Sequence, residues 1–155
     1  MNKIVLVCGL PGSGKTTWIK REMKKNERSI HISRDEVRFS LLKEDDAYFA
    51  KEKEVFKLFI NKIQSAINNN DLYTIYIDAT HLNKKSRNKV LKNLKLNDND
   101  LTEIVWFNVP LKTCIARNEQ RTGRALVPVD SILNMFESLE EPTPDEANII
   151  KIVKW

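Results

Sequence analysis

"GLPGSGKT", residues 9–16, holds three of the four glycines in a chain of 155 residues. It follows the continuous apolar run "KIVLVC" (residues 3–8), a pattern typical of a strand that is covered on both faces. Residues 15–26 follow it with a helical pattern. A glycine-rich turn of the form G-x-x-x-x-G-K-[ST] between a strand and a helix predicts a loop that binds the phosphates of a nucleoside triphosphate.

The residue types in this loop suit the chemistry of phosphate binding. Glycine permits turns that point backbone N–H groups inward, and the N-terminus of the following helix adds partial positive charge. We predict that Lys15 reaches the β- and γ-phosphates of ATP and that Thr16 places its hydroxyl on Mg²⁺. The predicted ATP-binding residues of the loop are Gly9, Leu10, Pro11, Gly12, Ser13, Gly14, Lys15, Thr16 and Thr17. A Rossmann dinucleotide site is not supported, because the spacing is not G-x-G-x-x-G.

The rest of the chain alternates between predicted strands and helices. Strands are predicted at residues 3–8, 29–33, 72–78, 102–109 and 148–155, and helices at residues 15–26, 34–43, 47–69, 83–96, 111–121 and 130–139. The longest of these helices carries an apolar stripe that begins at Phe49. Alternating strands and helices predict an α/β protein with the three-layer P-loop NTPase fold: a parallel sheet covered by helices on both faces. No repeat or linker interrupts the pattern, so we expect one domain.

Composition limits the class of protein. A hydrophobic content of 41% and a charged content of 30% are ordinary for a soluble globular protein. The net charge of +5 suits phosphate-rich partners. The N-terminal apolar run is too short for a signal peptide or a membrane span. Cys8 and Cys114 lie in apolar stretches, which favours buried free thiols over a disulfide and predicts a cytoplasmic protein.

Two classes of P-loop protein fit the sequence poorly. Each Asn-Lys pair lacks the aspartate of the guanine-reading N-K-x-D segment, which argues against a switch GTPase. A length of 155 residues leaves no room for the additional helical module of most motor ATPases. A small phosphotransferase fits best, since it needs a phosphate loop, an acceptor site and a mobile cationic lid.

The segment "HISRDEVR" supplies a candidate acceptor site. Asp35 lies just past the second predicted strand, near the carboxyl edge of the sheet, where open α/β sheets bind ligands. A carboxylate there can accept the proton of an attacking hydroxyl. Arg38 follows on the same helical face and can hold a phosphate of the acceptor. The alternative is that Asp35 caps a helix and pairs with Arg38 at the surface, and the spacing leaves both interpretations open.

The segment "YIDATHLNKKSR" ends the third predicted strand. Asp78 occupies a position where P-loop proteins often carry a carboxylate near Mg²⁺ or a lid arginine, unless it belongs to a solvated turn. For His81 we favour capping of the next helix at Asn83 over contact with substrate. The basic run that follows is interpreted as a solvated helix face or, alternatively, a phosphate-binding patch; it comprises Lys84, Lys85, Arg87 and Lys89.

The fourth glycine lies in a second basic segment, "ARNEQRTGRALVP" (residues 116–128). Arg117 and Arg121 share a helix face, and Arg124 follows in the loop after Gly123. Arginines carried by a closing helical lid can neutralise charge on a transferred phosphoryl group. The alternative is a basic helix end that complements its own dipole.

Four blocks, "GLPGSGKTTW", "ISRDEVR", "DATHLN" and "ARNEQR…VPVDSILNMFESL", resemble in order and rough spacing the kinase domain of phage-type 5′-polynucleotide kinases. The resemblance covers residues 1 to about 140. It implies an ATP- and Mg²⁺-dependent enzyme of nucleic acid repair, built on a single P-loop kinase domain (residues 1–155). Such an enzyme transfers the γ-phosphate of ATP to the 5′-hydroxyl of DNA or RNA.

The resemblance also implies a role for each candidate residue. The implied catalytic residues are Lys15, Asp35 as general base and Arg121 as the lid arginine that stabilises the transition state. Arg117 and Arg121 join the ATP-binding set, with Arg117 or Arg124 assisting the lid. The implied substrate-binding residues are Asp35, Arg38, which contacts the acceptor phosphate, and Asp78 behind them. Thr16 is the implied metal ligand.

The sequence also departs from the family pattern. No D-x-D-G-T segment is present, so we expect no 3′-phosphatase activity, and His81 stands where asparagine is usual. Related small kinases phosphorylate sugars and other small molecules. A kinase of a small hydroxylated metabolite or nucleoside, or a regulatory NTPase that transfers nothing, is therefore the alternative to a polynucleotide kinase. Asp35 argues against the regulatory NTPase, because a switch needs no acceptor base after its second strand.

Overall fold

Five parallel strands form one sheet in the computed structural model, which describes residues 1–154. The strands are β1 (Lys3–Cys8), β2 (Ser29–Ser33), β3 (Thr74–Asp78), β4 (Leu101–Asn108) and β5 (Ile149–Lys154). Their order across the sheet is β2-β3-β1-β4-β5, and all four pairings are parallel. The predicted parallel sheet is therefore confirmed. Trp155, the last residue of the predicted fifth strand, lies outside the described residues.

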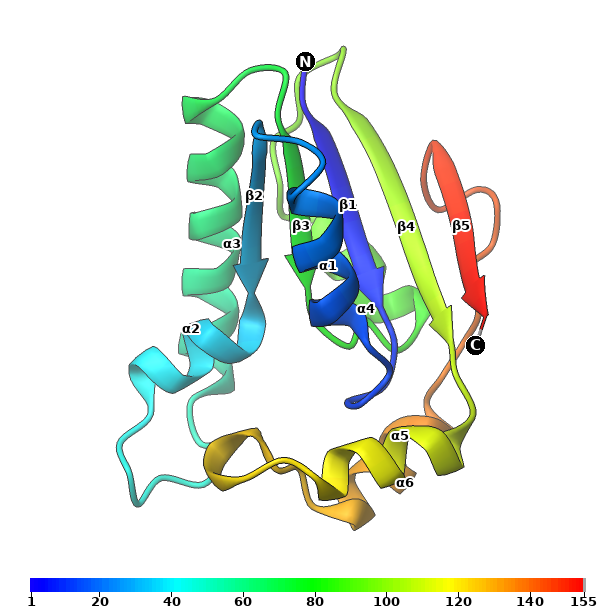
Figure 1. The fold of residues 1–155 in the computed structure, drawn as a ribbon. Helices are drawn as coiled ribbons and strands as arrows, with labels where there is room; N and C mark the ends of the chain where they lie inside the picture. Colours follow the sequence, from blue (N-terminus) through cyan, green and yellow to red (C-terminus); the bar gives the residue numbers. More distant parts are fainter. Residues whose placement is uncertain (155) are drawn as a thin grey trace.

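Six α-helices and one short 3₁₀-helix connect these strands. They are α1 (Lys15–Met23), α2 (Arg34–Leu41), α3 (Glu52–Asn69), α4 (Lys84–Lys92), α5 (Leu111–Glu119), η1 (Gly123–Ala125) and α6 (Val129–Glu137). In Figure 1, α1 lies in front of the sheet and α4 lies behind it. Within residues 1–154, no helix combines the length and the apolar composition that crossing a membrane requires.

The three layers follow from the alternation of side chains along the central strand. Ile4 and Leu6 of β1 face one side of the sheet, where they belong to a fully buried cluster with Phe59 of α3. Val5 and Val7 face the other side and share a second cluster with Ile19 of α1. Because β1 is buried on both faces, its apolar run is continuous, as the sequence predicts.

The carboxyl edge of the sheet gathers the segments that carry the candidate site. Figure 1 shows the strand arrowheads pointing toward one end of the molecule, where α2, α5 and α6 lie. The loop after β1 and the residues that end β2 and β3 all reach this edge, because parallel strands have their carboxyl ends on the same side.

The long helix starts later than its apolar stripe predicts. Residues 48–51 form a turn, and α3 begins at Glu52, so the prediction of a helix over residues 47–69 is wrong for its first turn. Tertiary contacts explain the difference. The hydroxyl of Tyr48 bonds to Asp35, and the Tyr48 ring lies 4.2 Å from the guanidinium of Arg38. As a result, Phe49 does not join the core, and 53% of its surface is exposed.

Both cysteines are buried free thiols. Cys8 ends β1 and Cys114 lies in α5, and neither forms a disulfide. Burial raises the pKa of the Cys8 thiol and also that of Cys114. The expectation of free thiols is confirmed.

Candidate active site

The loop after β1 adopts a conformation that requires glycine at two positions. Gly12 has φ of +83°, and a Cβ placed there would lie 2.4 Å from the backbone oxygen of Cys114. Gly14 has φ of +96° and stands immediately before α1. Left-handed backbone of this kind favours glycine. The glycine cluster in the sequence is thus a steric requirement of the loop.

Lys15 lies folded over the loop. Its Nζ atom donates hydrogen bonds to the backbone oxygens of Gly9 (2.8 Å) and Leu10 (3.1 Å). Burial lowers the pKa of Lys15, while the nearby carboxylates of Asp78 and Asp35 act in the opposite direction. The two hydrogen bonds place Nζ of Lys15 inside the loop, where it can reach an anion bound among the N–H groups.

A three-residue chain of hydrogen bonds lies beside the loop. Thr16 donates from Oγ1 to Oδ2 of Asp78 (2.7 Å), and Nε2 of His31 lies 2.9 Å from the same oxygen. Burial opposes ionisation of Asp78, but the hydrogen bond from His31, the charge of Lys15 and the Thr16 hydroxyl together hold its pKa below the usual range. Asp78 is thus a charged carboxylate inside the site.

The Thr16 hydroxyl and the Asp78 carboxylate fit a magnesium ion. Both are hard oxygen donors, and Mg²⁺ is usually held by one or two such protein groups together with waters and substrate phosphates. Residues 1–154 contain no cluster of three or more His, Cys, Asp or Glu side chains that could hold a metal by itself. The donor set therefore suits a metal that arrives with a nucleotide.

Asp35 lies at the start of α2 and is oriented by two donors. Arg38 and Tyr48 both donate to its Oδ1 atom, one from Nη1 and the other from the phenol hydroxyl. Burial and the charge of Asp35 raise the pKa of the Tyr48 phenol, so this group remains a protonated donor. Half of the Asp35 side chain is exposed (50%), and its Oδ2 atom takes no hydrogen bond from residues 1–154.

The alternative interpretation, in which Asp35 caps a helix and pairs with Arg38 at the surface, is wrong about the cap. The cap of α2 is Ser33, whose Oγ accepts a hydrogen bond from the backbone N–H of Glu36 at 3.2 Å. The pairing of Asp35 with Arg38 does occur. It takes place at the wall of a cavity, however, and Arg38 is only 5% exposed.

Glu52 anchors the guanidinium of Arg38 from the first turn of α3. Its two carboxylate oxygens accept from Nε (3.0 Å) and Nη2 (3.2 Å) of Arg38. Arg34 donates to the same carboxylate at 3.1 Å. Four of the five N–H groups of Arg38 are therefore used by Glu52, Asp35 and Tyr48. One N–H on Nη2 remains for another acceptor.

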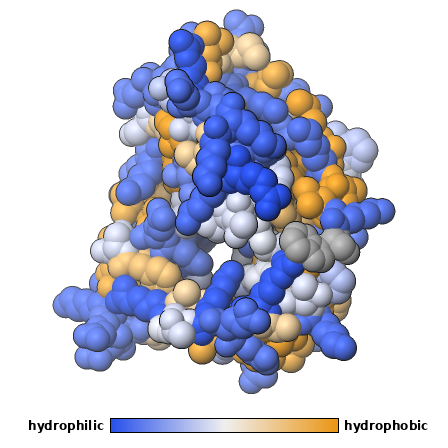
Figure 2. All heavy atoms as spheres, in the orientation of Figure 1, coloured by the Kyte–Doolittle hydropathy of each residue, from blue (hydrophilic) through white to orange (hydrophobic). Residues whose placement is uncertain are grey.

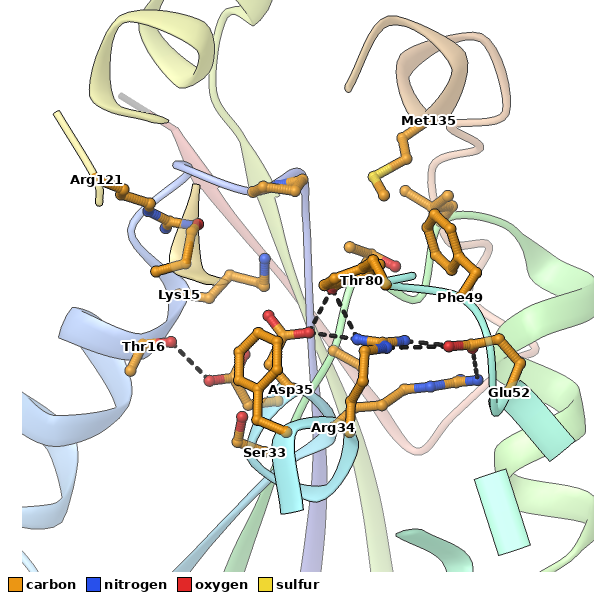
Figure 3. Close-up of a pocket in the computed structure, with 18 residues that line it drawn as sticks. Lys15, Thr16, Ser33, Arg34, Asp35, Phe49, Glu52, Thr80, Arg121 and Met135 are labelled. Atoms are coloured by element: carbon orange, nitrogen blue, oxygen red, sulfur yellow. Dashed lines mark hydrogen bonds and ion pairs between the residues drawn. The ribbon is translucent and has the colours of Figure 1, made fainter. Parts of the chain in front are cut away.

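These groups line one cavity of about 560 Å³. In Figure 3, Lys15, Thr16 and Arg121 lie on one side of it, Phe49 and Met135 on the other, and Asp35 between them. Figure 2 shows the molecule hollowed in the region of the lid, with hydrophilic side chains around the opening. The cavity thus joins the phosphate loop to the candidate acceptor residues.

A second cavity of about 410 Å³ lies on the other side of the phosphate loop. Its walls include Gly12 and Trp18 near the loop, Phe107 of the sheet, and Arg117. Arg121 lines both cavities. A group bound at the phosphate loop would therefore lie between the two cavities, with Arg121 bordering both.

The three lid arginines have different environments. Arg117 donates from Nη1 to the backbone oxygen of Gly12 (3.4 Å), and Arg121 donates to that of Ala125 (3.5 Å). Arg124 instead donates to the backbone oxygens of Phe39 (3.1 Å) and Leu42 (3.2 Å) at the end of α2. Arg117 and Arg121 thus face the phosphate loop and its cavities, whereas Arg124 fastens the lid to α2.

The predicted basic helix face is wrong for Arg87, which is fully buried. Its guanidinium pairs with Glu146 at 2.7 and 3.2 Å and donates to the backbone oxygen of His81 at 3.0 Å. His81 is buried as well and does not cap α4; Asn83 does so, in a capping box with Ser86. The Arg87–Glu146 pair instead secures the backbone of the turn after β3.

Burial of His81 predicts a pH-dependent stability. Burial lowers the pKa of this imidazole to about 3 in the folded protein, against an ordinary value of 6.5. At a pH between about 3 and 6.5, His81 binds a proton in the unfolded chain but not in the folded protein. The free energy of unfolding therefore falls as the pH drops below 6.5, by roughly 1.4 kcal/mol per pH unit.

His81→Asn is the variant that isolates this effect. The φ angle of His81 is +43°, which asparagine tolerates, and asparagine does not titrate. Urea unfolding at pH 7 and pH 5 is expected to show a loss of stability about 2 kcal/mol larger in the wild type than in the variant. An equal loss in both proteins would show that His81 is protonated in the folded state.

Sequence reasoning missed three side chains of the site. His31 contacts Asp78, Tyr48 contacts Asp35, and Glu52 holds Arg38. His31 stands between two apolar residues in the middle of the edge strand β2, and a titratable side chain at such a position is a usable signal. Nothing local marks Tyr48 or Glu52, because each meets its partner 13 or 14 residues away.

Comparison with known proteins now places the fold in a family. The sequence model of AAA_33, described as an AAA domain, matches residues 4–142. The chain belongs to this AAA-domain family. The matched range includes the phosphate loop, Asp35, Asp78 and the basic segment of residues 116–128.

Solved structures with the same fold differ in activity. A chain of the Pnkp1/Rnl/Hen1 RNA repair complex matches with a TM-score of 0.70 and 18% identity over 89% of this AAA-domain chain. This chain spans 44% of that protein's length. A sugar kinase from Janibacter sp. matches with a TM-score of 0.70 and 15% identity, covering 99% of this chain and 86% of that one.

A third match is Kti12 from Chaetomium thermophilum in complex with ADP-AlF3, with a TM-score of 0.65 and 18% identity. It covers 98% of this chain and 89% of that one. At these identities the likeness concerns the fold alone. The three structures establish the predicted α/β P-loop fold and leave the acceptor to be argued from the site.

Proposed function

We propose that residues 1–155 form a single P-loop kinase domain that transfers the γ-phosphate of ATP to the 5′-hydroxyl of DNA or RNA, in nucleic acid repair. The observation that carries this proposal is the shared cavity. Lys15 and Thr16 of the phosphate loop open into the same space as Asp35. A regulatory NTPase has no use for an oriented carboxylate at that place, whereas a phosphotransferase requires one.

The loop and the second cavity form the ATP side of the proposed reaction. Backbone N–H groups of Gly12 and of residues 14–17 hold the phosphates, Lys15 compensates their charge, and Arg117 borders the space for the nucleoside. Thr16 and Asp78 would hold Mg²⁺, which when bound neutralises charge on the β- and γ-phosphates.

Asp35 acts as the general base on the acceptor side. Its Oδ2 atom accepts the proton of the 5′-hydroxyl while Arg38 and Tyr48 hold the other oxygen in place. The acceptor oxygen forms a bond to the γ-phosphorus, the bond to the β–γ bridging oxygen breaks, and ADP leaves. Arg121, which borders both cavities, neutralises the negative charge that develops during transfer.

Arg38 is the proposed contact for the phosphate that lies 3′ to the attacked nucleoside. Its guanidinium is fixed by Glu52 and has one Nη2 N–H without a partner in residues 1–154, and Arg38 lines the cavity. A nucleoside 3′-monophosphate is therefore expected to be a much better acceptor than the bare nucleoside. Because the contact is ionic, acceptor affinity should fall as the salt concentration rises.

Arg38→Ala tests this assignment. We expect kcat/KM for the nucleoside 3′-monophosphate to fall by about 10- to 150-fold, as for loss of a charge-assisted contact of roughly 1.5–3 kcal/mol. Weak phosphorylation of the bare nucleoside should persist at a reduced rate, because Arg38 also holds Oδ1 of Asp35. The ratio of kcat/KM between the two acceptors isolates the phosphate contact and should fall toward 1. Arg28→Ala, an exposed arginine before β2, is the matched control and should behave as wild type.

The wild-type protein alone already separates the two kinase hypotheses. If it treats the nucleoside and its 3′-phosphate alike, the polynucleotide reading fails. A kinase of a small hydroxylated metabolite then takes its place, and the sugar panel described in the Discussion identifies the acceptor.

His31 is predicted to act by positioning Asp78. His31→Leu removes the hydrogen bond to Oδ2, and loss of such an outer partner typically costs about 10- to 100-fold in metal affinity or activity. We expect the Mg²⁺ concentration for half-maximal transfer to rise while the KM of the acceptor stays unchanged. His31→Gln, which retains an N–H donor, should recover much of the loss. A change confined to the KM of the acceptor would contradict this role.

A further inference from the structure

We propose that Phe49 provides a stacking face for the nucleobase of the acceptor's 5′-terminal nucleotide. The inference rests on the proposed function and deepens it, since it names the part of the acceptor that the far wall of the cavity recognises. The base would lie against Phe49 while the 5′-hydroxyl reaches Asp35.

Phe49 is available for a ligand. It lies in the turn of residues 48–51, is 53% exposed, and lines the cavity that contains Asp35. It belongs to neither hydrophobic cluster of the sheet as described for residues 1–154. A large aromatic side chain that faces a cavity and packs into no core is typical of a binding surface.

The ring is nonetheless held in a defined place. The Tyr48 and Phe49 rings meet edge to face, with centroids 4.6 Å apart and planes at 85°. The Arg38 guanidinium lies 5.8 Å from the Phe49 centroid. Tyr48 and Arg38 are also the two donors to Asp35. One turn of chain therefore fixes the general base and the aromatic face relative to each other.

Apolar side chains line part of the cavity wall on the side of Phe49. In Figure 3, Met135 of α6 projects into the same region of the cavity as Phe49. Leu82 and Ala125 also border this cavity. A thioether beside an aromatic ring offers a soft, adaptable surface. A flat ring inserted here would contact carbon and sulfur atoms on its faces.

Such a wall suits a base better than a sugar. A site that recognises a carbohydrate must pair the hydroxyls with polar groups, because each unpaired polar group is costly to bury. On the acceptor side of this cavity, the polar side chains of Asp35, Arg38 and Glu52 are already bonded to one another. The ribose with its 5′-hydroxyl and 3′-phosphate fits that polar part, and the base fits the apolar part beyond it.

The test uses two single-stranded oligonucleotides that differ only at the 5′ end. One ends in a normal nucleoside and the other in an abasic deoxyribose, and both keep the 5′-hydroxyl and the 3′-phosphodiester. Wild-type protein should prefer the normal end in kcat/KM by about 5- to 150-fold, as expected for base–aromatic stacking. Phe49→Ala should lower that ratio toward 1, and Phe49→Trp should retain it.

Phe136→Ala is the matched control. Phe136 is also an exposed phenylalanine (46%), but it lies on α6 and does not line the cavity. A second readout needs no catalysis: 2-aminopurine at the 5′ end should lose fluorescence on binding to the wild type and to Phe136→Ala, but not on binding to Phe49→Ala.

Three results would overturn the inference. Equal use of normal and abasic ends by the wild type would show that the base is not recognised, while leaving polynucleotide kinase activity intact. An equal loss on both substrates in Phe49→Ala would make Phe49 a structural residue. Failure to phosphorylate any oligonucleotide would refute the proposed function itself, and the inference with it.

Discussion

Lys15→Ala is expected to abolish ATP-dependent phosphoryl transfer. The Lys15 ammonium is the charge held inside the phosphate loop, by the backbone oxygens of Gly9 and Leu10. Its loss removes the cation enclosed by the loop itself, and we expect Arg121 and a bound Mg²⁺ alone to compensate too little of the charge that develops at the β,γ-bridge. Transfer of radiolabelled phosphate, measured with saturating ATP and acceptor, should fall below detection.

The matched control is Lys20→Ala. Lys20 lies on the same helix, α1, but it is exposed to solvent. That variant should retain wild-type turnover, and thermal unfolding should show that both variants are folded. Full activity in a folded Lys15→Ala protein would refute the assignment of a kinase.

Asp35→Asn is expected to lower turnover by roughly 10²-fold or more, as is typical for loss of a general base. Asparagine keeps the size of the side chain and one oxygen for Arg38 and Tyr48, but it removes the basic oxygen. Affinity for ATP should change little, because Asp35 lies on the acceptor side of Lys15 and Thr16 in the cavity (Figure 3). Single-turnover rates and nucleotide binding, measured separately, check both expectations.

Glu36→Gln is the control for this loss of charge. Glu36 is the next residue of α2 and is exposed, so the variant removes the same charge from the same helix end. It should leave turnover unchanged. If Asp35→Asn instead abolished ATP binding, Asp35 would be a metal-site or structural residue.

Much of the fold could be predicted because its determinants are local. The run in β1 and the glycines of the loop are read directly from neighbouring residues. The placement of Asp35 and Asp78 near the phosphate loop follows from one further rule, that parallel strands share a carboxyl edge. The structure brings both carboxylates to that edge, within one cavity.

The remaining features depend on contacts between distant segments. Arg87 reads as a solvated residue in a basic run, yet Glu146 pairs with it from 59 residues away and the pair is buried. The apolar stripe of α3 extends to Phe49, but the contact of Tyr48 with Asp35 ends the helix earlier. Spacing along one segment carries no information about such partners.

The roles of the three lid arginines also could not be predicted from their spacing in the sequence. The sequence groups three arginines in one basic segment, and their spacing does not distinguish them. In the structure Arg121 borders both cavities, whereas Arg124 binds the carbonyl groups at the end of α2. Only the tertiary placement of α2 separates a candidate catalytic arginine from one that fastens the lid.

The most direct test of the proposed polynucleotide kinase activity is the transfer of label from γ-labelled ATP, with Mg²⁺, to a panel of acceptors at equal concentration. The panel contains 5′-hydroxyl DNA and RNA oligonucleotides, the same oligonucleotides with 5′-phosphates, nucleosides, and free sugars including gluconate. We predict labelling of the 5′-hydroxyl oligonucleotides, with none of their 5′-phosphorylated counterparts or of the sugars. Labelling of a sugar in preference to every oligonucleotide would refute the assignment of a polynucleotide 5′-hydroxyl kinase.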